Sequence, residues 1–594
     1  MKKLLLAFCF ILATTAIARL SFAQSSGTPW GAVDGLGRKV ETSQTLETTK
    51  PNKTVGIFYF LWIDSADHKD PRSDGPYDVS KILAKLPEED VKNPEASRSD
   101  LWAPGNGTMH FWGEPLFGYY SAFDPWVLRR HVMLLADAGI DFLVFDTTNY
   151  LTYPEQVRAL CDVMLKIRSE GGATPQITFM LNTRAKDAAN NLWKEVYSTG
   201  KYDELLFKLE GKPLLIGDPD EIVDETLRNA LTLRKAHWPF TMVNTKKAWH
   251  WEAAYPQPYG YADDPNVPEQ VNVSVAQNLN RNPSAQVANM SSRQARGRSF
   301  HDGILEENLA TDEGRNFAEQ WKRAYELNPP YVMITGWNEW IAGRWDRGAA
   351  GKVFVDQYNR EYSRDIEPMK GGHLDAYYLQ MIEGIRRYKG VSPLPKLDKT
   401  LTVDAQGDFA QWNSISTKLS DWTFETQKRD FKGLGGNHYV NESGRNDFVE
   451  FKVTRDDKNF YFYAKTREAI QPNRPDGLCL LLDVDDDLSN GFIGGDYLVG
   501  LSYGENETSL SKYNGQEPNA WNWKEMGKVP CQIKGNELMI AVPFARLGLD
   551  AKKASFNNVS FKWLDNFTKD VTPSDLYLNG DVAPESRFFY KVTE

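Results

Sequence analysis

The sequence predicts an α/β protein in which a (β/α)8 TIM barrel is followed by an all-β sandwich domain. Apolar strand-like runs alternate with amphipathic helical patterns between residues 51 and 390, and such alternation is typical of a parallel sheet. Seven or eight units in this length favour a closed barrel over an open sheet. From residue 401 to residue 594 the pattern changes to short strands with polar turns between them, which favours a sandwich.

The first 23 residues have the organisation of a secretory signal peptide. Lys2 and Lys3 precede an apolar run that ends in small residues at Ser21-Phe22-Ala23. Arg19 interrupts this run, which is already too short to span a bilayer. We therefore expect secretion across the inner membrane, into the periplasm or beyond, and no membrane span. Residues 24–50 are predicted to be a leader.

The barrel strands are predicted from short runs rich in Val, Ile, Phe and Tyr. The clearest predicted helix lies between the first two predicted strands. Asp124 can cap it, Pro125 takes the first helical position and Gly139 ends it. Residues 391–400 are predicted to be a linker. The predicted barrel strands are Thr54–Trp62, Asp141–Asp146, Gln176–Asn182, Pro213–Gly217, Phe240–Asn244, Gln270–Ala276 and Tyr331–Trp337, with a further short one near Arg298–His301.

Composition narrows the class of partner. The formal net charge is -11 and no basic block is present, so we expect no nucleic-acid partner. The chain has 18 Trp, 26 Tyr and 30 Phe, and such rings suit sugars as well as an ordinary core. Cys161, Cys479 and Cys531 would remain after cleavage, an odd number that argues against a disulfide framework. Cys161 is predicted to be a buried thiol, and a Cys479–Cys531 pair is left open.

Polar residues end most of the predicted barrel strands, which is where active sites of such barrels lie. The first strand leads into Trp62 and Asp64, the second into Asp146, the third into Asn182 and the last into Glu339. A cap for the following helix is the alternative for a single residue such as Asn182. The whole set is less easily explained as capping.

Glu339 is the best catalytic candidate, because Trp337, Asn338 and Trp340 surround it. Flanking indoles exclude water and raise a carboxyl pKa, and an adjacent amide can bind a sugar hydroxyl. Glycoside hydrolysis needs two carboxyl groups, one to protonate the leaving oxygen and one to attack or to act as a base. The alternative is a structural Glu339 bonded to an Arg or Lys of a neighbouring strand.

Two further segments combine aromatic rings with acids. Residues 247–259 contain Trp249, Trp251 and Tyr255 around Glu252, which predicts a sugar subsite with Glu252 able to act as an acid. Residues 298–303 place His301 beside Asp302.

The residues of the barrel resemble glycoside hydrolase family 99, and the Asn-Glu-Trp element is shared with WbsX-like proteins. The resemblance lies in residues 118–125, in residues 130–146 and in Pro329-Pro330-Tyr331-Val332-Met333-Ile334-Thr335-Gly336-Trp337-Asn338-Glu339-Trp340. It implies a (β/α)8 fold, action on α-mannosides and Glu339 as a base toward the 2-hydroxyl. The family's second glutamate corresponds to Ala342. The acid role therefore passes to Glu252, Asp146 or Asp302, in that order.

The C-terminal region resembles carbohydrate-binding module family 9 in residues 460–466, 480–487, 494–497 and 580–584. Asp483, Asp485, Asp487 and Asp496 are predicted to bind Ca²⁺, since hard cations take oxygen ligands. A solvated acidic turn is the alternative. No cofactor is expected for catalysis.

Together these features predict a secreted glycoside hydrolase that cleaves α-linked glycans, mannoside-like or related, by carboxylate acid/base catalysis. The partner would be an oligosaccharide or polysaccharide. The alternative is a non-catalytic glycan-binding protein that kept the hydrolase cleft and lost its acid, as Ala342 would allow.

Overall fold

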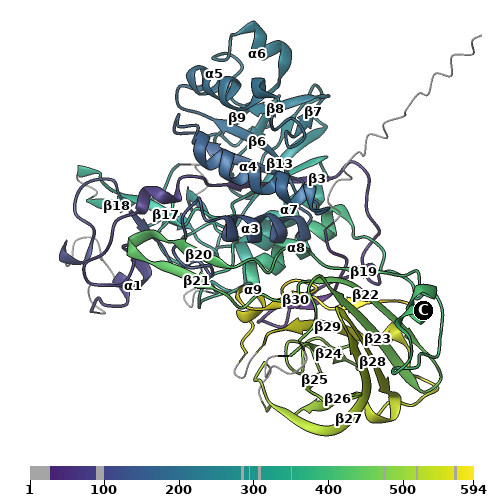
Figure 1. Ribbon diagram of the computed structural model, residues 1–594. Helices are drawn as coiled ribbons and strands as arrows, with labels where there is room; N and C mark the ends of the chain where they lie inside the picture. Colours follow the sequence, from purple (N-terminus) through teal and green to yellow (C-terminus); the bar gives the residue numbers. More distant parts are fainter. Residues whose placement is uncertain are drawn as a thin grey trace, which may run out of the picture.

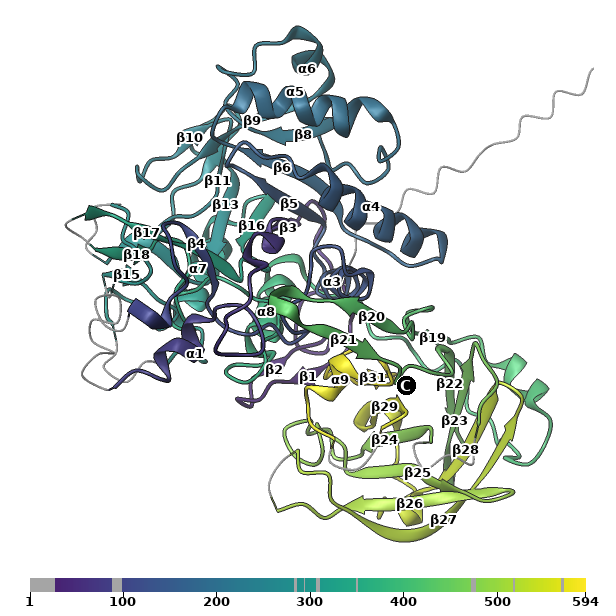
Figure 2. The same cartoon turned by 60° about the vertical axis from the view of Figure 1, so that its left-hand side comes forward.

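The computed structural model describes residues 27–87, 99–281, 286–292, 294–305, 310–348, 351–471, 477–516, 519–567 and 571–594. The predicted signal peptide lies outside the described residues. Within them the chain forms a barrel followed by a β domain, seen as two lobes in Figures 1 and 2. A short hairpin of β1 (Ala32–Val33) and β2 (Lys39–Val40) precedes the barrel.

Eight mutually parallel strands form the barrel wall, and strands adjacent in this series are adjacent in space for most of the circuit. The last strand pairs with the first, which is the arrangement of a (β/α)8 barrel. The strands are β3 (Thr54–Tyr59), β5 (Phe142–Thr147), β6 (Gln176–Leu181), β8 (Lys212–Ile216), β9 (Thr232–His237), β11 (Ala248–His250), β13 (Pro268–Ser274) and β16 (Tyr331–Thr335).

The circuit is interrupted between β11 and β13, where the described residues form no backbone ladder. Side chains join the two strands instead. Gln270 accepts from the His250 N–H at 2.7 Å and donates to the His250 carbonyl at 3.0 Å. Trp249 Nε1 donates to Glu269 at 2.7 Å. The barrel is therefore nearly closed, and this part of its wall is held by side chains.

Short antiparallel strands make the sheet mixed. β12 (Gly260–Tyr261) runs antiparallel to β13, β10 (Thr245–Lys246) pairs with β12, and β7 (Lys208–Leu209) pairs with β8. These pairings depart from the all-parallel barrel that the sequence predicts.

The outer helices are fewer than a complete (β/α)8 pattern requires. They are α3 (Pro125–Asp137), α4 (Pro154–Ser169), α5 (Ala185–Glu195), α6 (Glu225–Ala230), α7 (Arg315–Leu327) and α8 (Ala376–Lys389). Residues 238–267, all described, contain no helix. The best predicted helix is confirmed as α3, where Asp124 accepts from the Trp126 N–H at 3.1 Å.

The predicted strand Phe240–Asn244 is wrong, because that segment is a loop with Phe240 58% exposed. The strand lies earlier, at β9. Its Arg234 is buried but bonds Glu269 and Glu210, each at 2.7 Å, so a charged residue interrupts the apolar pattern. The short strand predicted near Arg298–His301 is also absent from the structure, and β15 (Ala295–Arg296) pairs instead with β14 (Gln277–Asn280).

The barrel interior is filled with apolar side chains, so it is a core and not a channel. The cluster includes Phe58, Phe142, Val144, Met180, Ile216, Trp249 and Met333. Polar chemistry is thereby confined to the ends of the strands. A three-stranded sheet of β4 (Thr108–Phe111), β17 (Ile341–Asp346) and β18 (Lys352–Phe354) follows directly from the end of β16, and the short α1 (Val79–Leu83) lies nearby.

The second domain is one continuous antiparallel sheet that curls back on itself. β27, 12 residues long, pairs with β26 over most of its length and with β28 at its end. Rings from distant strands meet inside: Phe462 lies 5.3 Å from Phe561, and Phe451 stacks 5.9 Å from Trp563. The halves therefore face each other as in a sandwich. In sheet order the strands are β19 (Leu419–Ser420), β22 (Phe448–Arg455), β23 (Asn459–Thr466), β28 (Glu537–Pro543), β27 (Trp523–Lys534), β26 (Glu507–Tyr513), β25 (Tyr497–Tyr503), β24 (Cys479–Asp483), β29 (Ser560–Asp565) and β30 (Asp581–Ala583), with β31 (Tyr590–Lys591) also on β29.

A hairpin of the second domain contacts the barrel. β20 (Arg429–Lys432) and β21 (His438–Asn441) lie beside α3 in Figures 1 and 2. Arg429 binds Asp124 at 2.8 Å, and the Tyr119 N–H donates to the Tyr439 hydroxyl at 2.7 Å. The helix α9 (Asp575–Leu578) also belongs to this junction, because Tyr577 donates to Asp375 at 2.8 Å.

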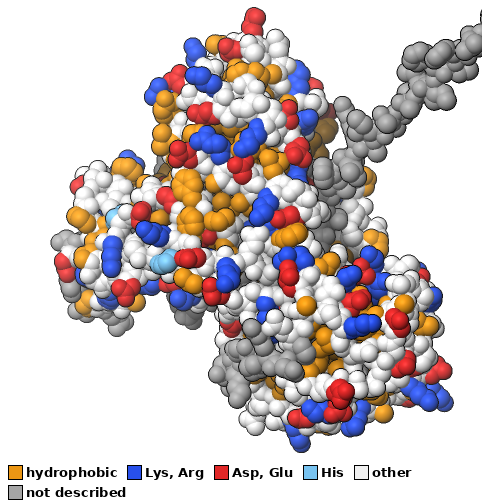
Figure 3. All heavy atoms as spheres, in the orientation of Figure 1, with side chains coloured by type: hydrophobic (Ala, Val, Ile, Leu, Met, Phe, Trp, Pro, Cys, Tyr) orange, Lys and Arg blue, Asp and Glu red, His pale blue; other side chains and the backbone are white. Residues whose placement is uncertain are grey.

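All three described cysteines are free and buried. The buried Cys161 thiol is as predicted, and the Cys479–Cys531 pair is not formed. No described helix combines the length and apolarity needed to cross a bilayer. On the face shown in Figure 3, acidic and basic side chains are interspersed over both lobes.

Candidate active site

A single buried guanidinium organises the carboxylates at the end of the barrel strands. Arg364 donates through one terminal nitrogen to Glu252 and through the other to Glu339, both at 2.8 Å. Asp356 lies 3.8 Å from the same side chain. Two of the predicted catalytic residues are thus side by side, although they are far apart in the sequence.

Glu339 is buried, and its side-chain contacts fall on one carboxylate oxygen. Its Oε2 accepts from Arg364 and from Gln357, the latter at 2.7 Å. Among the described residues no donor is bonded to Oε1, and 6% of the side chain is exposed. Burial raises the pKa of Glu339 well above its usual range, against the opposing charge of Arg364. Glu339 does form an ion pair, but its partner is Arg364 of the loop after β18 and not a residue of a neighbouring strand as in the structural alternative.

Glu252 is fully buried, and both of its oxygens are engaged. Oε2 accepts from Arg364, and Oε1 accepts from the Asn278 N–H at 3.0 Å. Burial raises the pKa of Glu252, and Arg364 opposes the rise. Glu252 therefore orients Arg364, and it does not present an oxygen for proton transfer to a ligand.

Asp356, which follows β18, is the accessible acid of the group. Its side chain is 42% exposed, and Oδ1 accepts from Asn278 at a long 3.5 Å. Loss of hydration raises the pKa of Asp356, and its negative charge raises that of Glu339 in turn. An accessible carboxyl group beside a second carboxyl group, both with raised pKa, is an arrangement that general acid–base catalysis uses.

Asp146 and Trp62 form a second polar pair at the mouth. Trp62 Nε1 donates to Asp146 at 2.9 Å, and the Thr148 N–H donates to its other oxygen at 3.0 Å. Burial raises the pKa of Asp146. Trp62 is half-buried and offers part of its ring to a ligand. Asp64 accepts from the Ala122 N–H at 3.1 Å and so fixes the loop before α3.

Three residues of the predicted sugar cleft are structural instead. Asn338 bonds the Phe60 backbone through both ends of its amide, accepting at 2.9 Å and donating at 3.1 Å. Trp337 is completely buried, with its ring 5.6 Å from that of His131. Trp340 stacks 4.6 Å from Trp112. These contacts correct the prediction of direct substrate binding by Asn338, Trp337 and Trp340.

The aromatic residues of segment 247–259, which includes β11, lie partly in the barrel core and partly at its mouth. Trp249 is completely buried in the barrel interior, which corrects its predicted sugar contact. Trp251 lies under Arg364, 4.8 Å from the guanidinium carbon to the ring centre. Tyr255 is partly exposed.

The remaining predicted residues lie apart from Arg364. Asp302 is exposed, and its N–H donates to Glu319 of α7 at 2.8 Å. This contact directs the segment toward the outside of the barrel, so the predicted acid role of Asp302 is not supported. His301 Nδ1 lies 3.0 Å from the Ser299 carbonyl. Asn182 is exposed after β6.

The predicted cation ligands of the second domain are mostly together. Asp483, Asp485 and Asp496 each place one oxygen within 4.8 Å of the others. Asp483 Oδ2 is buried without a partner among the described residues. Asp487 instead accepts from the Ser489 hydroxyl at 2.6 Å. The first three fit a hard cation such as Ca²⁺, and this binding remains a proposal.

Arg364, Asp356 and Gln357 are the site residues that the sequence analysis missed. All three come from the loop after β18, which is not a barrel strand. Asp356 and Gln357 follow the apolar Val353-Phe354-Val355, the same pattern that marked the barrel strand ends. That signal could have found Asp356. Arg364 stands in a polar run with no such signal.

Comparisons with known proteins give weak likenesses. No protein-family model matches the chain. No curated protein matches it. Among solved structures, the family 99 endo-alpha-mannosidase from Bacteroides thetaiotaomicron has a TM-score of 0.34 and 14% identity over 56% of this chain and 98% of that one. Its complex with bis-tris-propane has a TM-score of 0.32 and 14% identity over 56% and 96%. A family 29 fucosidase variant from Ruminococcus gnavus, in complex with fucose, has a TM-score of 0.20 and 10% identity over 95% and 99%. At these TM-scores the likenesses carry no argument about what this chain does.

Proposed function

We propose that the barrel is a glycoside hydrolase that cleaves α-linked glycans. The observation that carries the proposal is the Glu339 carboxylate, which Arg364 and Gln357 hold on one oxygen, with the accessible Asp356 beside the same guanidinium. The resemblance of residues 329–340 to family 99 supports the α linkage. The first 23 residues support secretion.

Glu339 is the proposed base or nucleophile. Arg364 and Gln357 fix Oε2, so the orientation of Oε1 is set before a ligand arrives. The charge of Arg364 offsets part of the rise in the Glu339 pKa that burial causes, and so favours the ionised form, which can accept a proton or attack carbon. The backbone N–H of Glu339 donates to Asp365, which further fixes the residue.

Asp356 is the proposed general acid. Its side chain is 42% exposed, more than that of Glu252 or Glu339, and loss of hydration raises its pKa in the direction that a general acid needs. Ala342, at the position that the resemblance assigns to the acid, lies on β17 opposite His110 and has no proton to give. Asp146 is a second acid within the same mouth.

Asp356→Asn is expected to lower kcat/KM on natural glycans by about 10²-fold, because the leaving oxygen would depart unprotonated. Aryl glycosides with acidic leaving groups need little protonation and should lose far less. Initial rates of the mature protein and the variant on both substrate types test this. A matched control is Asp302→Asn, which changes an exposed acid away from Arg364.

The outcome decides between roles for Asp356. Equal losses on both substrate types would contradict an acid role. The panel should include mannose, glucose, galactose and fucose in α linkage, because the contacts around Arg364 do not select one sugar.

A glycan-binding protein is the second candidate function. Two observations favour it: Glu252 has no free oxygen, and Ala342 replaces the expected acid. It predicts saturable binding of the same α-linked oligosaccharides with no product formed. The second domain is proposed to bind glycan on its resemblance to family 9 modules.

A further inference from the structure

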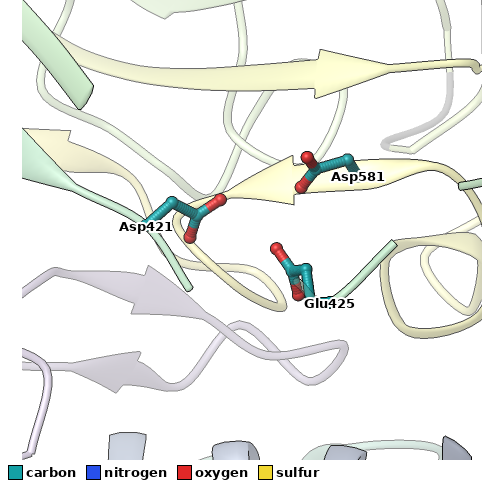
Figure 4. A group of neighbouring side chains, drawn as sticks. All are labelled: Asp421, Glu425 and Asp581. Atoms are coloured by element: carbon teal, nitrogen blue, oxygen red, sulfur yellow. The ribbon is translucent and has the colours of Figure 1, made fainter. Parts of the chain in front are cut away.

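Three carboxylates converge at the junction of the two domains, away from the proposed active site. Asp421, Glu425 and Asp581 each place an oxygen within 4.8 Å of the others. Figure 4 shows them pointing toward one another, with Asp581 on β30 and the other two on the segment that follows β19. Such a grouping is costly unless something neutralises it.

The carboxylates have oxygens without partners. Glu425 and Asp581 are 2% and 1% exposed. Glu425 Oε1, Asp581 Oδ1 and Asp421 Oδ2 are buried, and among the described residues none accepts a hydrogen bond. The nearby Glu585 Oε1 is also buried and accepts no hydrogen bond from the described residues. Buried polar atoms are normally satisfied, so these unpaired oxygens require an explanation.

The protein's own cations do not balance the charge. Arg130 of α3 donates to Glu425 at 2.8 Å and lies 3.6 Å from Glu585. Lys562 is fully buried nearby, but its amine is bonded to the Pro584 and Phe588 carbonyls. Two cations face four carboxyl groups, so two negative charges are uncompensated whenever all four are ionised.

We propose that Asp421, Glu425 and Asp581 bind a divalent cation, of which Ca²⁺ fits best, at the junction between barrel and β domain. The donors are all carboxylate oxygens, with no imidazole or thiolate in the group, and this favours a hard cation over zinc or copper. One divalent ion supplies the missing charge. The proposal does not depend on the hydrolase activity.

Water and ions can reach the group from an adjacent cavity of about 610 Å³. Asp421 and Glu585 line it, together with Trp30, Asp137 and Trp422. Ca²⁺ takes 6–8 oxygen ligands, so this cavity provides room for water ligands beside the carboxylates. Because Asp421 and Glu425 lie between β19 and the hairpin that contacts α3, the ion would fasten that segment to the second domain.

The test compares the mature protein with Asp421→Asn in Ca²⁺ and in a chelator. Wild type is expected to gain about 2–4 °C in Tm when Ca²⁺ replaces the chelator. The variant should lose the part of this gain that the Asp421 site contributes. In the chelator it should match or exceed wild type, because one repelling charge is gone. A residue with a merely structural role would destabilise under both conditions.

The second acidic group provides the control. Asp485→Asn changes the other candidate cation site and should retain the Asp421-dependent part of the gain. Equilibrium dialysis with Ca²⁺ should show one site fewer in Asp421→Asn than in wild type. An unchanged number of bound ions in Asp421→Asn, or a Tm of wild type that is the same in Ca²⁺ and chelator, would overturn the proposal.

Discussion

Replacing Glu339 by glutamine is expected to lower kcat/KM on α-linked glycans by about 10⁴-fold while the protein stays folded. Glutamine has nearly the same volume, and its carbonyl oxygen can still accept from Arg364. It cannot take a proton or attack an anomeric carbon. Steady-state rates together with a melting curve measure the two effects separately.

The control is Glu252→Gln, the same change on the other carboxylate of the same guanidinium. Because both Glu252 oxygens are used internally, it should retain turnover within about 10-fold of wild type, in line with an indirect effect. Equal losses in the two variants would mean that the base has not been identified. Full activity of Glu339→Gln would place the chemistry elsewhere.

The pH dependence adds a directional check. The charge of Arg364 lowers the pKa of Glu339, so Arg364→Met should move the acidic limb of the kcat/KM profile to higher pH. This limb reports ionisation of the base in the free enzyme.

Replacing Arg364 by methionine is expected to lower the free energy of unfolding by about 3–5 kcal/mol, because it leaves buried carboxylates unpaired. Without the guanidinium, the pKa of Glu252 and that of Glu339 rise further. A carboxyl whose folded pKa is raised binds protons more tightly when folded, so stability falls as pH rises between the two pKa values. The loss should therefore be larger at pH 8 than at pH 5.

Denaturant unfolding at the two pH values measures this effect, with Arg364→Lys as the matched variant. Lysine keeps the charge but cannot bind both carboxylates through a planar fork. Its loss should lie between wild type and methionine. A methionine variant that is equally stable at both pH values would show that Glu252 and Glu339 do not depend on Arg364 for their charge.

Much of the barrel could be predicted, because β3, β5, β6, β13 and β16 are short apolar runs whose period is visible in the sequence. β9 could not, since its buried Arg234 is neutralised by Glu269 of β13 and by Glu210 in the turn between β7 and β8. The sequence also led to Glu339, because an acid between indoles is unusual. The sequence could not show that the Asn338 amide bonds the Phe60 backbone, or that Arg364 pairs with both Glu252 and Glu339. Both are contacts between residues far apart in the sequence.

The seam between β11 and β13 has a mechanical consequence. Backbone ladders resist separation through many bonds at once, whereas the direct contacts between β11 and β13 are side-chain bonds of Gln270 and Trp249. Local opening should need less free energy at this seam than at the laddered edges. Glu252 follows β11 by two residues, so the anchor of Arg364 stands beside this seam. When a bulky ligand binds at the mouth, we expect the backbone to move at the β11–β13 seam. Glu339, which follows the laddered strand β16, would keep its position.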